Sequence, residues 1–243
     1  MFSGFELDWP WIGLGAAVVL LALLFGTNAL RSRPAISRWR DPAWLGWLGM
    51  VVYLIHNVEE YGIASDGVRN AFPDSLCGIL GLGAYPGCAI PTDFYLYVNL
   101  TIFWVVAPAC ALLARRRAAF GFVIYGVIAV NLLVHVGGSI ATWAYGPGLV
   151  TALVLFLPAS VWAGIVLVRD ERLGWGRLAA VLALGIAVHA VLMGSVLLFV
   201  HGAIPAVVLN GLQVANGALV LAVGALLQRG LPAATIAARG RGG

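Results

Sequence analysis

Two histidines and two adjacent glutamates carry the chemistry that this sequence suggests. His56, Glu59 and Glu60 form the run His-Asn-Val-Glu-Glu inside a stretch that is otherwise apolar. Residues three and four positions apart share one face of a helix, so these three side chains project together. Neighbouring carboxylates in lipid are costly unless a cation neutralises them, which makes this run the first candidate for a functional site.

Other polar residues are spaced to meet this run. Asn131 and His135 are four positions apart and share a helix face, and Tyr53 precedes His56 by about one turn. Counted at about 1.5 Å per residue from the start of each span, both histidines fall in the outer half of the membrane. We predict a cavity there, with Tyr53, Asn131 and Asn210 binding the substrate.

Two histidines and a carboxylate are ligands that zinc and non-haem iron accept. The first interpretation is therefore a membrane enzyme in which His56, Glu59 and His135 bind zinc or iron. Glu59, Glu60 and Tyr145 are its predicted catalytic residues, and its partners are membrane lipid and a hydrophobic small-molecule substrate. With zinc, the metal would activate water and one glutamate would act as general base.

Two other interpretations stay open. A metal-free acid–base catalyst, such as an isoprenoid or terpene cyclase, would use a protonated glutamate and would stabilise a carbocation with aromatic rings. A transporter or proton-coupled carrier would use the polar side chains as a relay. A retinal protein is excluded, because the chain contains no lysine to form the Schiff base.

Apolar runs supply the elements that position these residues. The chain has 243 residues, of which 62% are hydrophobic and 10% charged, a composition typical of membrane proteins. A helix crosses the hydrocarbon core with about 20 mainly apolar residues. Seven runs of about this length are present: 10–30, 43–63, 93–114, 119–141, 148–168, 178–200 and 205–228.

The basic residues predict the orientation of these runs. Of the 14 basic residues, all except Arg69 follow the first, third, fifth or seventh run. Basic connections stay in the cytoplasm during insertion. We predict an all-α, polytopic bundle of seven transmembrane helices in the bacterial cytoplasmic membrane, with the N-terminus outside and the C-terminus cytoplasmic. The arginines are spread over four segments, so we expect no nucleic-acid partner.

The organisation is that of one membrane domain, residues 1–228, followed by a Gly-, Ala- and Arg-rich tail, 229–243, that we expect to be loose. Pro108 and Pro158 lie inside spans and predict a kink in each helix. Cys77 and Cys88 lie in the longest connection, on the outer side, where a disulfide and a pair of free cysteines both fit.

Three polar positions favour packing over function. His189 stands alone in the sixth span, as core histidines often do. Gln213 and Asn216 are spaced by three in the seventh span and are expected to hydrogen-bond between helices.

Three features in sequence order together resemble the HXXEE-domain family of membrane proteins: His56-x-x-Glu59-Glu60, His135 and Tyr145-x-Pro147-Gly148. The resemblance covers about residues 43–165. It implies that these residues matter, but the family has no settled activity, so the resemblance leaves all three interpretations open.

Overall fold

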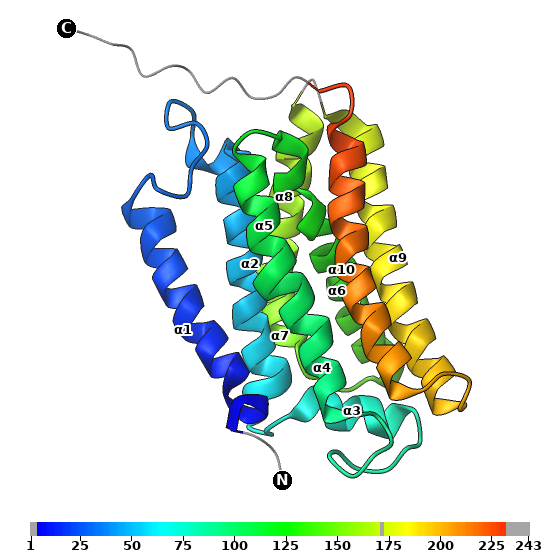
Figure 1. Ribbon diagram of the computed structural model, residues 1–243. Helices are drawn as coiled ribbons and strands as arrows, with labels where there is room; N and C mark the ends of the chain where they lie inside the picture. Colours follow the sequence, from blue (N-terminus) through cyan, green and yellow to red (C-terminus); the bar gives the residue numbers. More distant parts are fainter. Residues whose placement is uncertain (1–3, 171–172, 232–243) are drawn as a thin grey trace, which may run out of the picture.

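The computed structural model describes residues 4–170 and 173–231, and long helices packed side by side dominate these ranges (Figure 1). No β-strand occurs in the described part, where Ile63 and Arg69 pair only as an isolated bridge. The predicted all-α class is confirmed. The predicted loose tail lies outside the described residues, apart from 229–231.

The longer α-helices keep the order that the apolar runs predict. Their bounds are α1 Gly4–Gly26, α2 Pro42–Asn57, α4 Thr92–Asn99, α5 Ala107–Ala114, α6 Val123–Thr142, α8 Leu157–Arg169, α9 Gly174–Val200 and α10 Ala206–Gln228. Two short helices, α3 Ala71–Ile79 and α7 Leu149–Thr151, lie in the connections.

Within residues 4–170 and 173–231, six helical segments are long and apolar enough to cross a membrane. They are Asp8–Gly26, Thr92–Ala114, Ala118–Thr142, Leu149–Arg169, Gly174–Val200 and Ala206–Gln228. Each corresponds to one of the seven predicted runs. The remaining run corresponds to α2 and the helical turn after it, Pro42–Gly62, which is not among the six.

Helix α2 lies inside the bundle and positions the candidate site. Asp41 caps its first turn, and the carboxylate accepts hydrogen bonds from the backbone N–H groups of Ala43 and Trp44. Its apolar side chains are buried on several faces, including those of Trp44, Val51 and Leu54. A polar group at the far end of α2 is therefore surrounded by other helices.

Three long helices contain π-helical turns: Val58–Gly62 after α2, Leu100–Val106 between α4 and α5, and Ala152–Phe156 between α7 and α8. The last two come directly before the turns that contain Pro108 and Pro158. Proline lacks an N–H and its ring clashes with the carbonyl four residues earlier. The expected break at each proline thus takes the form of a widened turn before it.

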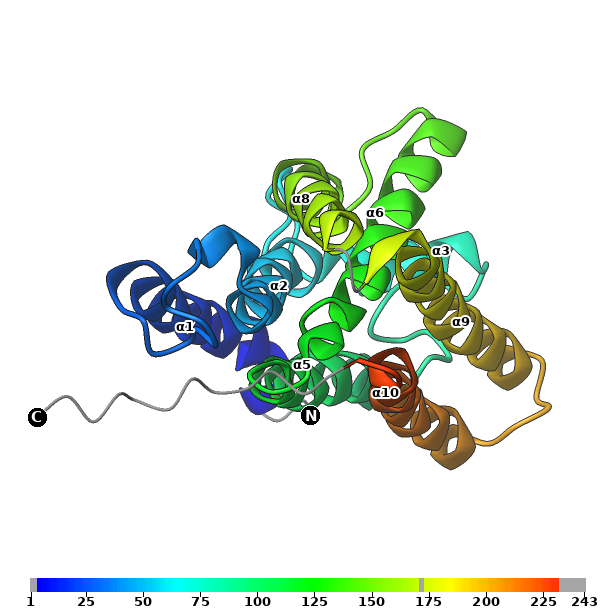
Figure 2. The ribbon, with the colours of Figure 1, turned by 90° about the horizontal axis from the view of Figure 1, so that it is seen from above.

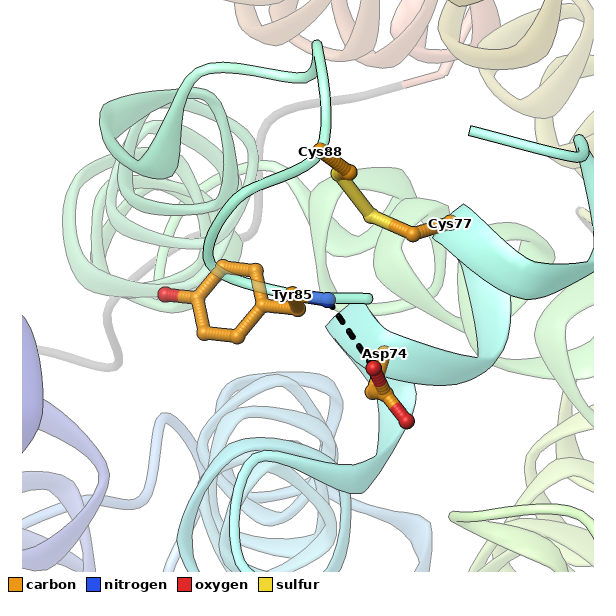
Figure 3. The surroundings of a disulfide bond; sticks show 4 residues. All are labelled: Asp74, Cys77, Tyr85 and Cys88. Carbon is orange, nitrogen blue, oxygen red and sulfur yellow. Dashed lines mark hydrogen bonds between the residues drawn. A yellow bond between two sulfur atoms is a disulfide. The ribbon is translucent and has the colours of Figure 1, made fainter. Parts of the chain in front are cut away.

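The connection between α2 and α4 folds over one end of the bundle. It contains α3, and a disulfide joins Cys77 on α3 to Cys88 farther along the connection (Figure 3). The backbone N–H of Tyr85 donates to the carboxylate of Asp74, which ties the same two segments together again (Figure 3). Of the two possibilities for these cysteines, the structure has the disulfide.

The polar residues of α10 hold it against α9. The side-chain amide of Gln213 donates to the Ser195 hydroxyl at 2.8 Å, and that of Asn216 donates to the Val188 carbonyl at 2.9 Å. This confirms the prediction that they form interhelical hydrogen bonds.

Candidate functional site

Three side chains from two helical segments converge inside the bundle. His56 lies on the last turn of α2, Glu60 on the π-helical turn that follows, and His135 on α6. The Nε2 atom of His56 is 3.4 Å from Glu60 Oε2, and that of His135 is 3.2 Å from Glu60 Oε1. One ligand atom from each residue lies within 4.8 Å of the other two, so the group could hold a metal ion. All three are buried.

The turn before α7 closes over the two histidines. Gly148 has a φ of +90°, a conformation that L side chains rarely adopt. A Cβ at this position would lie 2.5 Å from Cε1 of His135 and 2.8 Å from Cε1 of His56. Glycine is therefore required twice, for the backbone conformation and for the close approach to both rings.

Glu59 points to this turn instead of joining the three-residue group. Its carboxylate accepts hydrogen bonds from the Tyr145 hydroxyl at 2.7 Å, the Ser65 hydroxyl at 2.9 Å and the backbone N–H of Thr151 at 2.7 Å. The N–H of Val150 lies at 3.2 Å. Glu59 thus binds the start of α7 and fixes the turn on the end of α2.

Thr151 connects Glu59 to His56 and determines which nitrogen of His56 carries the proton. The hydroxyl of Thr151 has one proton and lies 2.5 Å from Glu59 Oε2 and 2.7 Å from His56 Nδ1. The carboxylate can only accept hydrogen bonds, so the Thr151 hydroxyl donates to Glu59. Because the hydroxyl has no second proton, Nδ1 of His56 must donate a hydrogen bond to the hydroxyl oxygen. In neutral His56 the lone pair is then on Nε2, which faces Glu60 and has no hydrogen-bond partner among the described residues.

A cavity of about 220 Å³ adjoins the group, with Glu60 and His135 in its wall. Most of the lining is apolar or aromatic. Tyr53 and Asn131 also line it, and the amide of Asn131 donates to the Tyr53 hydroxyl at 2.7 Å. Both residues thus border the cavity, and their contact with a substrate stays a prediction.

Tyr145 lies in the connection between α6 and α7. Its hydroxyl contacts Glu59, and the residue does not line the cavity. Its hydroxyl also accepts a hydrogen bond from the backbone N–H of Ser65 at 3.0 Å. Burial, followed by the hydrogen bond to Glu59, raises the pKa of the Tyr145 hydroxyl. The hydroxyl therefore stays protonated and keeps donating to the carboxylate.

Two predicted placements differ from the structure. Glu60, and not Glu59, lies with the two histidines, because residues i+3 and i+4 diverge where α2 widens into a π-helical turn. Asn210 does not line the cavity. Its amide donates to the Asp93 carboxylate at 3.0 Å, where α10 packs on the start of α4.

Two residues near the site were not predicted. Thr151 gives no signal by itself, because its role depends on contacts more than 90 positions away in the chain. Asn99 does give one, since an amide inside an apolar span is a functional hypothesis by default. Asn99 lines the cavity.

His189 also lines the cavity. Its Nδ1 lies 2.9 Å from the Gly185 carbonyl oxygen, as expected for a core histidine with a hydrogen-bond partner.

Residues 47–163 match the model of a family described as "Protein of unknown function with HXXEE motif". This confirms the resemblance, and the matched region contains His56, Glu59, Glu60, His135 and the Gly148 turn. No curated protein and no solved structure matches the chain.

Proposed function

We propose that this protein is a membrane-embedded, metal-dependent enzyme that acts on a lipid-soluble substrate. Its metal ligands are His56, Glu60 and His135. The observation that carries the proposal is the convergence of these buried side chains beside an apolar cavity. A structural role alone gives no reason to bring two imidazoles and a carboxylate together away from water.

The geometry suits a first-row metal ion. In a tetrahedral site with metal–ligand distances of about 2.0–2.1 Å, neighbouring ligand atoms are about 3.3 Å apart. His56 lies 3.4 Å from Oε2 of Glu60 and His135 lies 3.2 Å from Oε1, close to that spacing, whereas the ligand atoms of the whole group lie within 4.8 Å of one another and would draw closer around an ion. The His56 lone pair on Nε2 faces a carboxylate, which is repulsive unless a proton or a cation lies between them. Zinc and non-haem iron both accept this ligand set.

Glu59, Thr151 and Tyr145 serve this site as positioning residues. Metal-binding histidines usually donate their second ring N–H to a polar partner, which fixes the orientation of the ring. For His56 that partner is Thr151, which Glu59 in turn orients. A bound zinc or iron ion supplies Lewis acidity or redox chemistry, and Glu60 and His135 face the cavity where the substrate reacts.

The proposed topology has seven spans: the six long apolar segments and Pro42–Gly62, which is less apolar. Its polar end explains this, since His56, Asn57, Glu59 and Glu60 lower its mean hydropathy. Apart from the connection that carries Arg69, the described arginine-bearing segments lie at the end of the bundle opposite α3 (Figure 1). In a bacterial cytoplasmic membrane that end faces the cytoplasm, which places the site in the outer half.

Elemental analysis of the purified protein tests the proposal. Wild type should contain about one zinc or iron ion per chain, and His56→Ala and His135→Ala should lose it. His201→Ala is the matched control, because this exposed histidine lies at the end of α9. Wild type without metal after purification in the absence of chelators, or equal metal in all variants, would refute the metal site.

One observation favours a second candidate, a metal-free acid–base catalyst. The contacts of 3.2 and 3.4 Å around Glu60 also suit a shared proton, which would satisfy the same lone pairs. Aromatic rings surround the group, with Phe156 4.3 Å from the ring of His56, and such rings stabilise carbocations. An active protein without metal, and with turnover of an isoprenoid substrate, would select this candidate.

A further inference from the structure

The two helices that border the cavity touch closely in one half of the bundle and separate in the other. A Cβ at Gly126 of α6 would lie 1.9 Å from the Val181 carbonyl oxygen, and one at Gly185 of α9 would lie 2.0 Å from the Gly126 carbonyl oxygen. Beyond this contact the helices run apart toward their ends at Thr142 and Val200 (Figure 2).

The cavity lies in this wedge and reaches the outside of the bundle. Val134 of α6 and Met193 of α9 both line it. The same two side chains are 51% and 39% exposed, so they also face the surroundings of the bundle. In a membrane those surroundings are lipid, so an opening between these two side chains would connect the cavity to the bilayer.

The end of the wedge is covered. Phe72 and Leu76 of α3 line the cavity, and the Cys77–Cys88 disulfide ties α3 to the rest of its connection (Figure 3). The ring of Phe72 lies 6.2 Å from that of His135. Because this cover closes the end of the bundle, the lateral opening is the natural route for an apolar molecule.

Two residues of the cavity wall, Asn99 and Asn131, each have a buried amide oxygen without a hydrogen-bond partner among the described residues. The amide nitrogen of Asn99 donates to the Tyr95 carbonyl at 2.9 Å, and since a carbonyl can only accept, this fixes the side-chain orientation. The opposite atom, Oδ1, has no hydrogen-bond partner among the described residues, although Asn99 is only 1% exposed. The buried hydroxyl of Tyr95 also lacks one. Such groups are normally satisfied, by protein, water or a ligand.

We propose that this cavity binds a small alcohol that is dissolved in the membrane. The alcohol enters from the bilayer between Val134 and Met193, and its hydroxyl donates a hydrogen bond to Asn99 Oδ1. The inference rests on the proposed function, for which the alcohol is the substrate. An amine could donate the same bond, but a charged amine is disfavoured in an apolar cavity. A volume of about 220 Å³ lies below the roughly 300–1,000 Å³ of sites for drug-sized ligands, so the molecule is short.

Photolabelling in nanodiscs tests the inference, with an octanol that carries a diazirine as the probe. We expect adducts on cavity-lining peptides of α6 and α9, and unlabelled octanol should compete for them. Octyl methyl ether, which cannot donate a hydrogen bond, should compete roughly fivefold less well. Equal competition by alcohol and ether in wild type would overturn the inference without any variant.

Three variants separate the parts of the inference. Asn99→Leu should abolish the preference for the alcohol over the ether, and Val134→Trp should reduce labelling about tenfold by filling the opening. Ile186→Trp is the control, because this residue is 62% exposed on α9 and does not line the cavity. Wild-type labelling and wild-type preference in both test variants would refute the site.

Metal analysis of the same samples distinguishes the two proposals. A bound metal with no alcohol-selective labelling contradicts the alcohol site and leaves the metal enzyme standing. Alcohol-selective labelling without any metal contradicts the metal enzyme and leaves an alcohol-binding cavity. Water as the partner of Asn99 predicts no competition by octanol, which also overturns the inference.

Discussion

Thr151→Val removes the hydrogen bond that orients His56, together with the one that the same hydroxyl donates to Glu59. Valine has nearly the shape of threonine but cannot accept the proton on Nδ1, which now lies 2.7 Å from the Thr151 hydroxyl. Glu59 keeps its bonds from Tyr145, Ser65 and the backbone N–H of Thr151, so the turn stays in place. The change therefore acts on His56 and on one hydrogen bond of Glu59, while the other bonds of Glu59 continue to hold the turn.

The expected magnitude follows from similar sites. Removing the partner of a metal-binding histidine usually weakens metal affinity about 10–100-fold, which corresponds to about 1.4–2.8 kcal/mol. The loss of binding free energy should exceed that caused by removing a surface hydrogen bond. His56 is fully buried, and the proton on its Nδ1 would have no other partner.

Competition with a chromogenic chelator measures this affinity, with thermal unfolding recorded on the same samples. Thr142→Val is the matched control, since the Thr142 hydroxyl bonds only to the Gly138 carbonyl in an exposed turn of α6. Thr151→Ser should restore most of the affinity. An unchanged metal affinity in Thr151→Val, or a loss as large in Thr142→Val, would refute the proposed tautomer of His56.

Three further predictions concern the turn, the glutamate pair and the disulfide. Gly148→Ala should abolish metal binding, since its Cβ would lie 2.5 Å from a histidine ring, while Gly146→Ala, with its nearest contact at 3.3 Å, should retain it; equal metal content in both would contradict the packing. Glu60→Gln should lose the metal and Glu59→Gln should keep it with weaker affinity; elemental analysis checks this, and the reverse order would restore Glu59 as the ligand. Cys77→Ser should lower the free energy of unfolding by about 2–4 kcal/mol, as measured by thermal unfolding against reduced wild type, which should match it; an unchanged stability would be incompatible with a structural disulfide.

The sequence predicts the helices well because their signal is local. An apolar run reports its own length, so the predicted 93–114 agrees with Thr92–Ala114 and 205–228 with Ala206–Gln228. The first run is less accurate, since the helix ends at Gly26 and not at residue 30. Ala29 and Leu30 extend the apolar run in the sequence, but they belong to the connection.

The site is predicted only to the level of its residues. Spacing by three and four brings His56, Glu59 and Glu60 to one face of a regular helix, and on that face the two glutamates are equivalent. The π-helical turn makes them different, and no local pattern marks it. Likewise, the contact between Glu59 and Thr151 depends on how the segment after α6 folds back onto α2. The spacing of residues along one helix gives no information about that fold.

The irregular turns support a functional origin for the site. Each of the three π-helical segments contributes to it: Val58–Gly62 carries Glu60, Leu100–Val106 carries Phe103 of the cavity wall, and Ala152–Phe156 carries the ring that packs on His56. A π-helical turn is rare and occurs frequently at functional sites. Two of them precede prolines, which prevent the helix from relaxing to regular geometry. The prolines explain why two of these turns are irregular, but they do not explain why all three lie around one buried His/Glu group, and this arrangement favours a site that binds or reacts over one that only packs.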